Sequence, residues 1–286
     1  MVSAMTATAI LFPGQGSLTA DSPADARAAW PELVEDAAAL LGDDPFERAA
    51  HSTAYAQPAI FVASMAAWRE RADGIDDICA FAGHSLGELS ALAAAGAIPV
   101  DDALRLVVLR GRLMTDAAEA LAGDGGMLAL LGGTPEAAAD LAAAHGLTIA
   151  NDNAPGQVVL SGERERLKDL SRVARSEGFK SMVLDVPGAF HSPAIAAAEQ
   201  PFLGALLEID WQPTAVPVVS GLTAAPFGDV PLELARALVR PVRWREVMGV
   251  LWGLGAREFV DVGPGHVLDR LVGRNLPLLE EHALAG

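Results

Sequence analysis

The sequence predicts an α/β protein in which a small subdomain is inserted into a larger one. The apolar run at residues 78–82 is followed by a turn and then by an Ala- and Leu-rich stretch, which is typical of a strand that leads into a helix. Residues 127–189 alternate strand and helix patterns in the order βαββαβ, the order of a ferredoxin-like unit. We therefore expect a large subdomain of residues 1–126 and 190–286 and a ferredoxin-like small subdomain of residues 127–189.

The remaining elements follow in chain order. An apolar run that ends at Phe12 predicts a buried strand, and Pro13 and Gly14 predict the turn that closes it. Pro58 lies in the first turn of a helix pattern, where its missing N–H costs nothing. The main helix patterns cover residues 25–41, 59–71, 194–207, 232–238 and 244–254, and the late strand patterns cover residues 216–220 and 257–262.

Composition argues against several classes of function. The 286 residues carry a net charge of −17, and a general nucleic-acid binder needs a surplus of Lys and Arg to contact phosphates. No apolar run is long enough to span a membrane and the N-terminus lacks a secretory pattern, so a cytoplasmic protein is expected. The single cysteine, Cys79, cannot form an internal disulfide, and no histidine spacing predicts a metal site.

The turn at residues 83–87 has the pattern G-x-S-x-G, with Ser85 at its centre. A nucleophilic serine in a strained strand-to-helix turn needs glycine two residues before and after it, since larger side chains would collide with the neighbouring strand or helix. The N-terminus of the following helix would also favour an oxyanion beside the serine. An ordinary turn has the same pattern, so a base must be found elsewhere in the chain.

His191 is the best candidate for that base, because it precedes a helix on the segment that returns from the small subdomain. His84 is adjacent to Ser85 but points away from it in such a turn, so a structural role is expected. Arg110 lies in an apolar helix, where an arginine either extends to the surface or pairs with an anion. Gln15 lies between two glycines, which either let the backbone approach a ligand or form a plain turn.

Six motifs, taken together, resemble the family of malonyl-CoA:acyl carrier protein transacylases and the acyltransferase domains of polyketide synthases. They are GQGS at residues 14–17, GHSLGE at 83–88, RG at 110–111, NAPGQVVLSG at 153–162, AFHSP at 189–193 and DVGPGHVL at 261–268. The resemblance covers nearly the whole chain, in order. It implies an α/β-hydrolase-like large subdomain, and its ferredoxin-like insert agrees with the βαββαβ pattern.

The resemblance also implies the roles of the catalytic residues. Ser85 would be the nucleophile and His191 its base, in a dyad whose imidazole is oriented by a backbone carbonyl. The carbonyl that we expect in this position is that of Leu254. The backbone N–H groups of Gln15 and Leu86 would form the oxyanion hole.

Substrate-binding residues are implied in the same way. Arg110 would bind the free carboxylate of the malonyl group, and Gln57 would lie near the same pocket. Phe190 would limit the room for a 2-methyl branch. Gly188 stands where many relatives have a larger residue, which would widen the pocket.

The implied reaction is a ping-pong transfer of malonyl from malonyl-CoA, through a Ser85 ester, to the phosphopantetheine thiol of an acyl carrier protein, for fatty acid or polyketide synthesis. No bound cofactor is expected, the phosphopantetheine being carried by the partner, and the enzyme is expected to be a monomer. Carrier proteins are acidic, so the late arginines are either scattered surface charges or a docking patch. They are Arg236, Arg240, Arg243, Arg270 and Arg274.

Three alternatives stand beside this function. The same scaffold would serve an acyl-thioester hydrolase that clears stalled carrier proteins, or a transferase for another acyl group. A non-catalytic docking subunit would normally have lost Ser85, His191 or Arg110, and all three are present.

Overall fold

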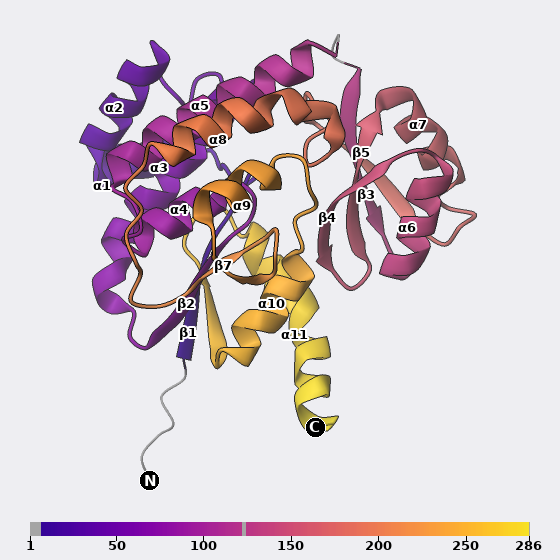
Figure 1. Cartoon of the computed structure of the whole chain (residues 1–286). Coiled ribbons are helices and arrows are strands. Elements are labelled where there is room, and N and C mark those ends of the chain that lie inside the picture. The colour runs from indigo at the N-terminus through magenta and orange to yellow at the C-terminus, as the bar shows by residue number, and fades with distance from the viewer. Residues whose placement is uncertain (1–6, 122–123, 286) are drawn as a thin grey trace.

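The computed structural model describes residues 7–121 and 124–285, and these residues form two β-sheets (Figure 1). The sheet of the large subdomain has the order β8-β7-β2-β1-β9, and its pairings are parallel except for that of β7 with β8. Its strands are β1 (Ala7–Phe12), β2 (Ile78–Gly83), β7 (Val218–Ser220), β8 (Ala225–Pro226) and β9 (Ala256–Asp261). The structure therefore has the α/β class that the sequence predicts.

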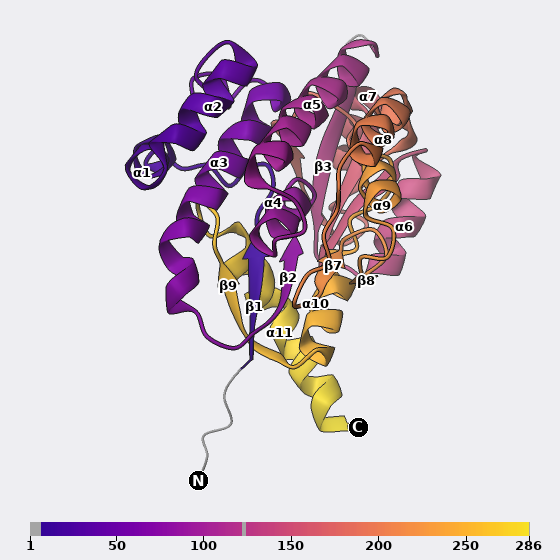
Figure 2. The same ribbon diagram turned by 60° about the vertical axis from the view of Figure 1, so that its left-hand side comes forward.

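Helices cover both faces of this sheet (Figure 2). Because side chains alternate along a strand, Ile10 and Phe12 of β1 pack with α3 and α5, whereas Ala9 and Leu11 pack with α10 and α11. The helices of the large subdomain are α1 (Ser22–Ala29), α2 (Pro31–Leu41), α3 (Thr53–Arg71), α4 (Gly87–Ala94), α5 (Val100–Glu119), α8 (Glu199–Leu207), α9 (Val230–Ala237), α10 (Trp244–Gly253) and α11 (Val267–Ala285), with short 3₁₀ turns η1 (Ala72–Gly74) and η2 (Pro193–Ala198). Burial on both faces explains why the central strands are almost continuously apolar.

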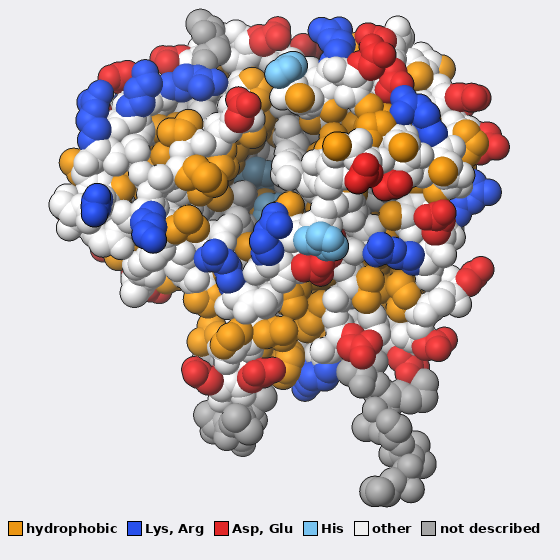
Figure 3. Space-filling view, turned by 180° about the vertical axis from the view of Figure 1, so that it is seen from behind, with side chains coloured by type: hydrophobic (Ala, Val, Ile, Leu, Met, Phe, Trp, Pro, Cys, Tyr) orange, Lys and Arg blue, Asp and Glu red, His pale blue; other side chains and the backbone are white. Residues whose placement is uncertain are grey.

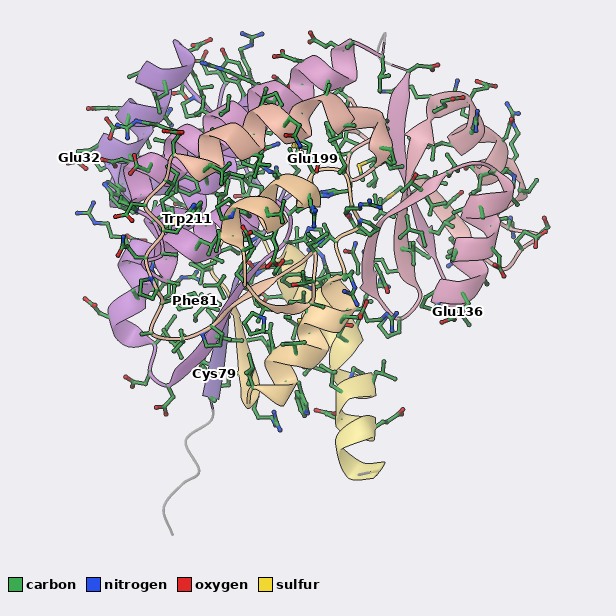
Figure 4. The ribbon with its side chains drawn as sticks, in the orientation of Figure 1. Glu32, Cys79, Phe81, Glu136, Glu199 and Trp211 are labelled. Carbon is green, nitrogen blue, oxygen red and sulfur yellow. The ribbon has the colours of Figure 1, made fainter. Side chains whose placement is uncertain are left out.

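Aromatic packing fixes α3 on the sheet. Phe81 on β2 (Figure 4) meets Trp68 of α3 edge to face, with ring centroids 5.6 Å apart, and Phe12 on β1 meets the same indole at 6.2 Å. Such pairs add stability beyond the apolar area that they bury. The strand that leads to Ser85 is therefore held from the helix side as well as by its neighbours in the sheet.

The small subdomain is an antiparallel sheet with two helices on one face. Its strands β3 (Gly125–Leu131), β4 (Thr148–Ala154), β5 (Gln157–Glu163) and β6 (Lys180–Leu184) have the order β4-β5-β3-β6, and α6 (Pro135–Ala144) and α7 (Arg164–Val173) connect them. Leu128 and Leu130 point into a core with these two helices, while Met127 and Ala129 join the core of the large subdomain. This is the ferredoxin-like arrangement that the βαββαβ pattern predicts.

Two predicted helices are interrupted. The pattern at residues 25–41 forms two helices, because Trp30 precedes Pro31 and is therefore kept out of the helical region (φ −151°, ψ 71°). The pattern at residues 194–207 begins with the 3₁₀ turn η2, where Ile195 departs from helical angles, and only then continues as α8. Along the described residues, none of the helices combines the length and the hydrophobicity needed to cross a bilayer.

Candidate active site

Ser85 lies in the tight turn between β2 and α4. Its φ is +54°, in the left-handed region that most residues avoid. A Cβ on Gly83 would lie 1.9 Å from the carbonyl carbon of Gly87, and a Cβ on Gly87 would lie 2.0 Å from the carbonyl oxygen of Phe12. The steric reason that the G-x-S-x-G pattern suggests is confirmed, since no side chain fits at either position.

His191 lies against the serine. Its Nε2 is 2.8 Å from Ser85 Oγ, and its Nδ1 is 2.8 Å from the carbonyl oxygen of Ala237. A carbonyl oxygen only accepts, so Nδ1 carries the proton and Nε2 is free to accept the Oγ proton. Burial, and then the positive charge of Arg110, lower the pKa of His191 to about 3, so the imidazole is neutral at physiological pH.

The expectation that Leu254 orients this imidazole is wrong. Leu254 immediately follows α10, and its side chain is exposed. The carbonyl that accepts from Nδ1 belongs to Ala237, the last residue of α9. The final carbonyls of a helix have no partner within it, and this one is satisfied by the histidine.

Arg110 projects from α5 toward the same hydroxyl. Its Nη2 donates to Ser85 Oγ at 3.0 Å and its Nη1 donates to Gln57 Oε1 at 2.7 Å, while Gln57 Nε2 lies 3.2 Å from Met114 Sδ. Only 4% of Arg110 is exposed, so of the two alternatives for this arginine the surface one is wrong. Burial lowers its pKa to about 10, which leaves the guanidinium charged.

Gln15 and Leu86 follow the ends of neighbouring parallel strands. Phe12 of β1 is paired with Gly83 of β2, so the loop after β1 lies beside the turn that holds the serine. A Cβ on Gly14 would lie 2.6 Å from the carbonyl oxygen of His84, which shows how close the two loops approach. Leu86 immediately precedes α4, where backbone N–H groups lack partners within the helix.

Phe190 is buried and its ring packs on Gly188. A Cβ at position 188 would lie 2.7 Å from the ring of Phe190 and 2.9 Å from the side chain of Ala118. The expected widening of the pocket is therefore not found, because the space next to the glycine is occupied by these two side chains. Gly188 instead lets the phenyl ring sit close to the backbone.

A cavity of about 710 Å³ lies next to this site. Its wall includes Gln15, Thr53 at the start of α3, Arg164 of the small subdomain and residues 184–187, which return from it. Figure 3 views the molecule from behind and shows a hollow in this face, with histidine side chains at the bottom of the hollow. Among the described residues, no group of three or more His, Cys, Asp or Glu side chains is placed to hold a metal ion.

Comparison with known proteins shows the family. A family model described as "Acyl transferase domain" matches residues 36–275. This chain belongs to the acyl transferase domain family. The family resemblance that the six motifs indicate is thereby confirmed.

Several curated relatives of this acyl transferase domain are similar over nearly its whole length. The chain is 36% identical over 282 residues to the polyketide biosynthesis malonyl CoA-acyl carrier protein transacylase BaeC of Bacillus velezensis, covering 92% of the chain and 95% of that protein. It is 34% identical over 300 residues to the malonyl CoA-acyl carrier protein transacylase of Escherichia coli K12, covering 98% and 96%. It is also 37% identical to the polyketide biosynthesis protein ThaF of Burkholderia thailandensis, of which it spans only 24%.

Solved structures agree with the fold of this acyl transferase domain. The malonyl CoA-acyl carrier protein transacylase of Burkholderia pseudomallei superposes with a TM-score of 0.87 at 31% identity, covering 95% of this chain and 98% of that one. The complex PlMCAT:AntF, a type II PKS acyl-carrier protein with its malonyl-transacylase, gives a TM-score of 0.85 at 31% identity, covering 95% and 94%.

Glu88 is a residue of this acyl transferase domain that our sequence analysis did not single out. It is 3% exposed in the first turn of α4, and its Oε1 accepts the backbone N–H of Gly221 at 2.7 Å. Burial raises its pKa to about 7, against the smaller opposing effect of the Gly221 N–H and of Arg110. A charged residue within an otherwise uncharged helix was the available signal.

Replacing Glu88 by glutamine should remove a loss of folding stability that grows as the pH rises. The raised pKa means that the folded protein holds this proton more tightly than the unfolded chain, so the stability it contributes is lost as pH rises through about 7. The E88Q variant keeps an oxygen for the Gly221 N–H and should gain about 1–3 kcal/mol over the wild type at about pH 8, but not at about pH 5.

Urea unfolding of both proteins at the two pH values measures this difference. The lowered pKa of His191 has the opposite sign, because its contribution is lost as pH falls, but it is common to both proteins and cancels. An equal stability difference at both pH values would show that Glu88 does not titrate with the raised pKa.

Proposed function

We propose that this protein transfers a malonyl group from malonyl-CoA to the phosphopantetheine thiol of an acyl carrier protein. The observation that carries the proposal is the convergence on one hydroxyl: Ser85 Oγ lies 2.8 Å from the free nitrogen of His191 and 3.0 Å from the guanidinium of Arg110. A base beside a nucleophile supports acyl transfer, and a buried cation beside both supports an acyl group with a free carboxylate. The names of the relatives support the same reaction.

The first half of the reaction forms the acyl-enzyme. His191 Nε2 takes the Ser85 proton as Oγ attacks the thioester carbonyl carbon, and the backbone N–H groups of Gln15 and Leu86 stabilise the oxyanion. The carbon–sulfur bond then breaks, and His191 returns the proton to the sulfur of coenzyme A. Arg110, held by Gln57, binds the malonyl carboxylate with its forked N–H groups.

The second half reverses these steps with a different thiol. His191 takes the proton of the phosphopantetheine thiol, the sulfur attacks the ester carbonyl, and the proton returns to Ser85 Oγ as the carbon–oxygen bond breaks. The buried ring of Phe190, together with Leu86, supports malonyl over 2-methylmalonyl. We propose that the chain acts as a cytoplasmic monomer without a bound cofactor.

Intact-protein mass spectrometry tests the reaction. The wild type and Ser85→Ala are mixed with malonyl-CoA, methylmalonyl-CoA or acetyl-CoA, and a phosphopantetheinylated carrier protein is then added. The proposal requires a malonyl-sized adduct on the wild type and none on Ser85→Ala. Addition of the carrier should then remove the adduct from the enzyme, and the carrier should gain the same mass. Loss of the adduct with no gain on the carrier would instead support the hydrolase.

The late arginines lie on two parts of the large subdomain. Arg236 and Arg240 are exposed on either side of Ala237, and Arg270 and Arg274 are exposed on α11. Arg243 differs, because it pairs with Glu246 and donates to the carbonyl of Thr223, so it is the weakest member of the expected patch. We propose the four exposed arginines as the docking patch for an acidic carrier.

Charge reversal of these arginines should weaken carrier recognition alone. The pairs Arg236→Glu with Arg240→Glu, and Arg270→Glu with Arg274→Glu, should each raise the KM for the carrier roughly 3- to 10-fold, while self-acylation by malonyl-CoA keeps its rate. Arg105→Glu, at an exposed ion pair on α5, is the matched control. If self-acylation falls together with carrier transfer, the patch does not act in docking.

A further inference from the structure

Strand β4 of the small subdomain is joined directly to the segment that orients His191. The N–H of Asp152 donates to the carbonyl of Val242 at 2.9 Å, and the N–H of Val242 donates to the carbonyl of Ala150 at 2.8 Å. Val242 thereby forms a parallel bridge beside β4, although it belongs to the large subdomain. It lies five residues after Ala237, whose carbonyl accepts from the histidine.

An ion pair strengthens the same connection. Arg245 donates from Nε to both carboxylate oxygens of Asp152 at 3.1 Å and from Nη2 to one of them at 2.7 Å. The two side chains are only 30% and 18% exposed. Such a forked contact fixes orientation as well as distance, so the segment after α9 is held against β4 by backbone and side chain together.

The next residue of β4 is joined to the nucleophile turn. Asn153 Oδ1 lies 2.8 Å from Nε2 of His84, the residue immediately before Ser85. An amide oxygen only accepts, so His84 donates from Nε2. Asn153 is 6% exposed, and its backbone carbonyl accepts from Asn275 Nδ2 of α11 at 3.0 Å. This residue of β4 is therefore bonded to α11 as well as to the nucleophile turn.

We propose that Asn153 is a positioning residue for the catalytic dyad and that residues 150–153 of β4 are the common support for its two members. The nucleophile turn and the segment that orients His191 are far apart in sequence, yet each is bonded to consecutive residues of this one strand. The separation of 2.8 Å between Ser85 Oγ and His191 Nε2 depends on both attachments. The inference rests on the proposed function of the dyad.

The test uses the whole chain and two readouts of Ser85 reactivity. Asn153→Ala, His84→Ala and the double variant are compared with the wild type for labelling by phenylmethylsulfonyl fluoride and for acylation by malonyl-CoA. The sulfonyl fluoride reports on the dyad without needing the malonyl contacts. Ser161→Ala on the neighbouring strand β5 is the matched control, because its buried hydroxyl has no hydrogen-bond partner in the described structure.

We expect Asn153→Ala to lower both rate constants roughly 10- to 100-fold, with the KM for malonyl-CoA within about twofold of the wild type, since a small displacement of reacting groups is costly. The double variant should be no slower than the slower single variant, because both remove one interaction. Ser161→Ala should react at the wild-type rate.

A fall in Tm with unchanged rates of labelling and acylation would overturn the proposal, as would additive losses in the double variant. If Asn153→Ala does not fold, Asp152→Asn removes the ion pair and keeps the backbone bonds, and it should slow sulfonyl fluoride labelling several-fold; unchanged labelling overturns the proposal. Failure of the wild type to react with malonyl-CoA, with sulfonyl fluoride labelling intact, would count against the proposed function and leave the dyad test standing.

Discussion

Replacing His191 by alanine should lower the rate at which malonyl-CoA acylates Ser85 by roughly 10²- to 10⁴-fold, the range expected for loss of a general base. Among the residues that the structure describes, the other polar contact to Ser85 Oγ comes from Arg110, and a guanidinium donates but cannot accept a proton. The variant therefore keeps the nucleophile Ser85 and the guanidinium of Arg110, but it has no base that can take the proton of Ser85. Quenched-flow acylation followed by intact-protein mass gives the rate.

His145→Ala is the matched control for that substitution, because this histidine lies at the end of α6 in the small subdomain, where its Nδ1 donates to the carbonyl of Leu141 at 3.0 Å. It should react at the wild-type rate. A His191→Ala variant that retains its fold and acylates at more than about a tenth of the wild-type rate would exclude His191 as the base.

The pH profile of the wild type follows from the same histidine. An ordinary imidazole would lose half of its basic form near pH 6.5, but burial and Arg110 lower the pKa of His191 to about 3. The acylation rate should therefore stay level as the pH falls from about 8 to about 5. A fall centred near the ordinary histidine pKa would show that the site is more hydrated than its burial implies.

Replacing Arg110 by glutamine should remove the preference for a carboxylated acyl group. A buried charge pair of about 2 kcal/mol corresponds to a preference of roughly 30-fold, so the ratio of malonyl to acetyl transfer should fall by about that factor. The ratio is the decisive quantity because Arg110 also donates to Ser85 Oγ, and loss of that bond affects both substrates alike. Parallel kcat/KM measurements with malonyl-CoA and acetyl-CoA give it.

Arg110→Lys distinguishes charge from geometry. A lysine keeps the positive charge but not the fork that reaches Gln57 and Ser85 together, so it should restore only part of the malonyl preference.

The Arg110→Gln variant should also move the acid limb of the pH profile upward, because the second cause of the lowered His191 pKa is gone. An unchanged malonyl to acetyl ratio in Arg110→Gln would show that the carboxylate is bound elsewhere.

The parts of the site that the sequence could predict are those set by local geometry. Ser85 could be located because the collisions that require Gly83 and Gly87 occur within a few residues of it. The order of strands and helices in the small subdomain could be predicted because its helices and strands differ in period. The predicted helix at residues 25–41 is interrupted at Trp30, because Pro31 disfavours helical angles in the residue before it even within a run of good helix formers.

The rest depends on contacts between distant segments. Nothing near Leu254 or Ala237 distinguishes their carbonyls; the choice is made by how α9 packs beside His191. The same holds for the bond between His84 and Asn153, which lie 69 positions apart. A sequence pattern indicates which side chains can react. The backbone carbonyls and the neighbouring side chains that orient them come from distant segments, so they are identified only in the folded chain.

Both members of the dyad have left-handed backbone conformations, with φ +54° at Ser85 and +56° at His191. β-Branched residues are strongly disfavoured there, because a second substituent on Cβ crowds the adjacent carbonyl. Among hydroxyl and thiol nucleophiles, the turn thus accommodates serine or cysteine but not threonine. The φ angle at position 85 therefore limits which single replacements of the nucleophile are possible. Of these, Ser85→Cys is the one that keeps a nucleophile, and it would give a thiol enzyme.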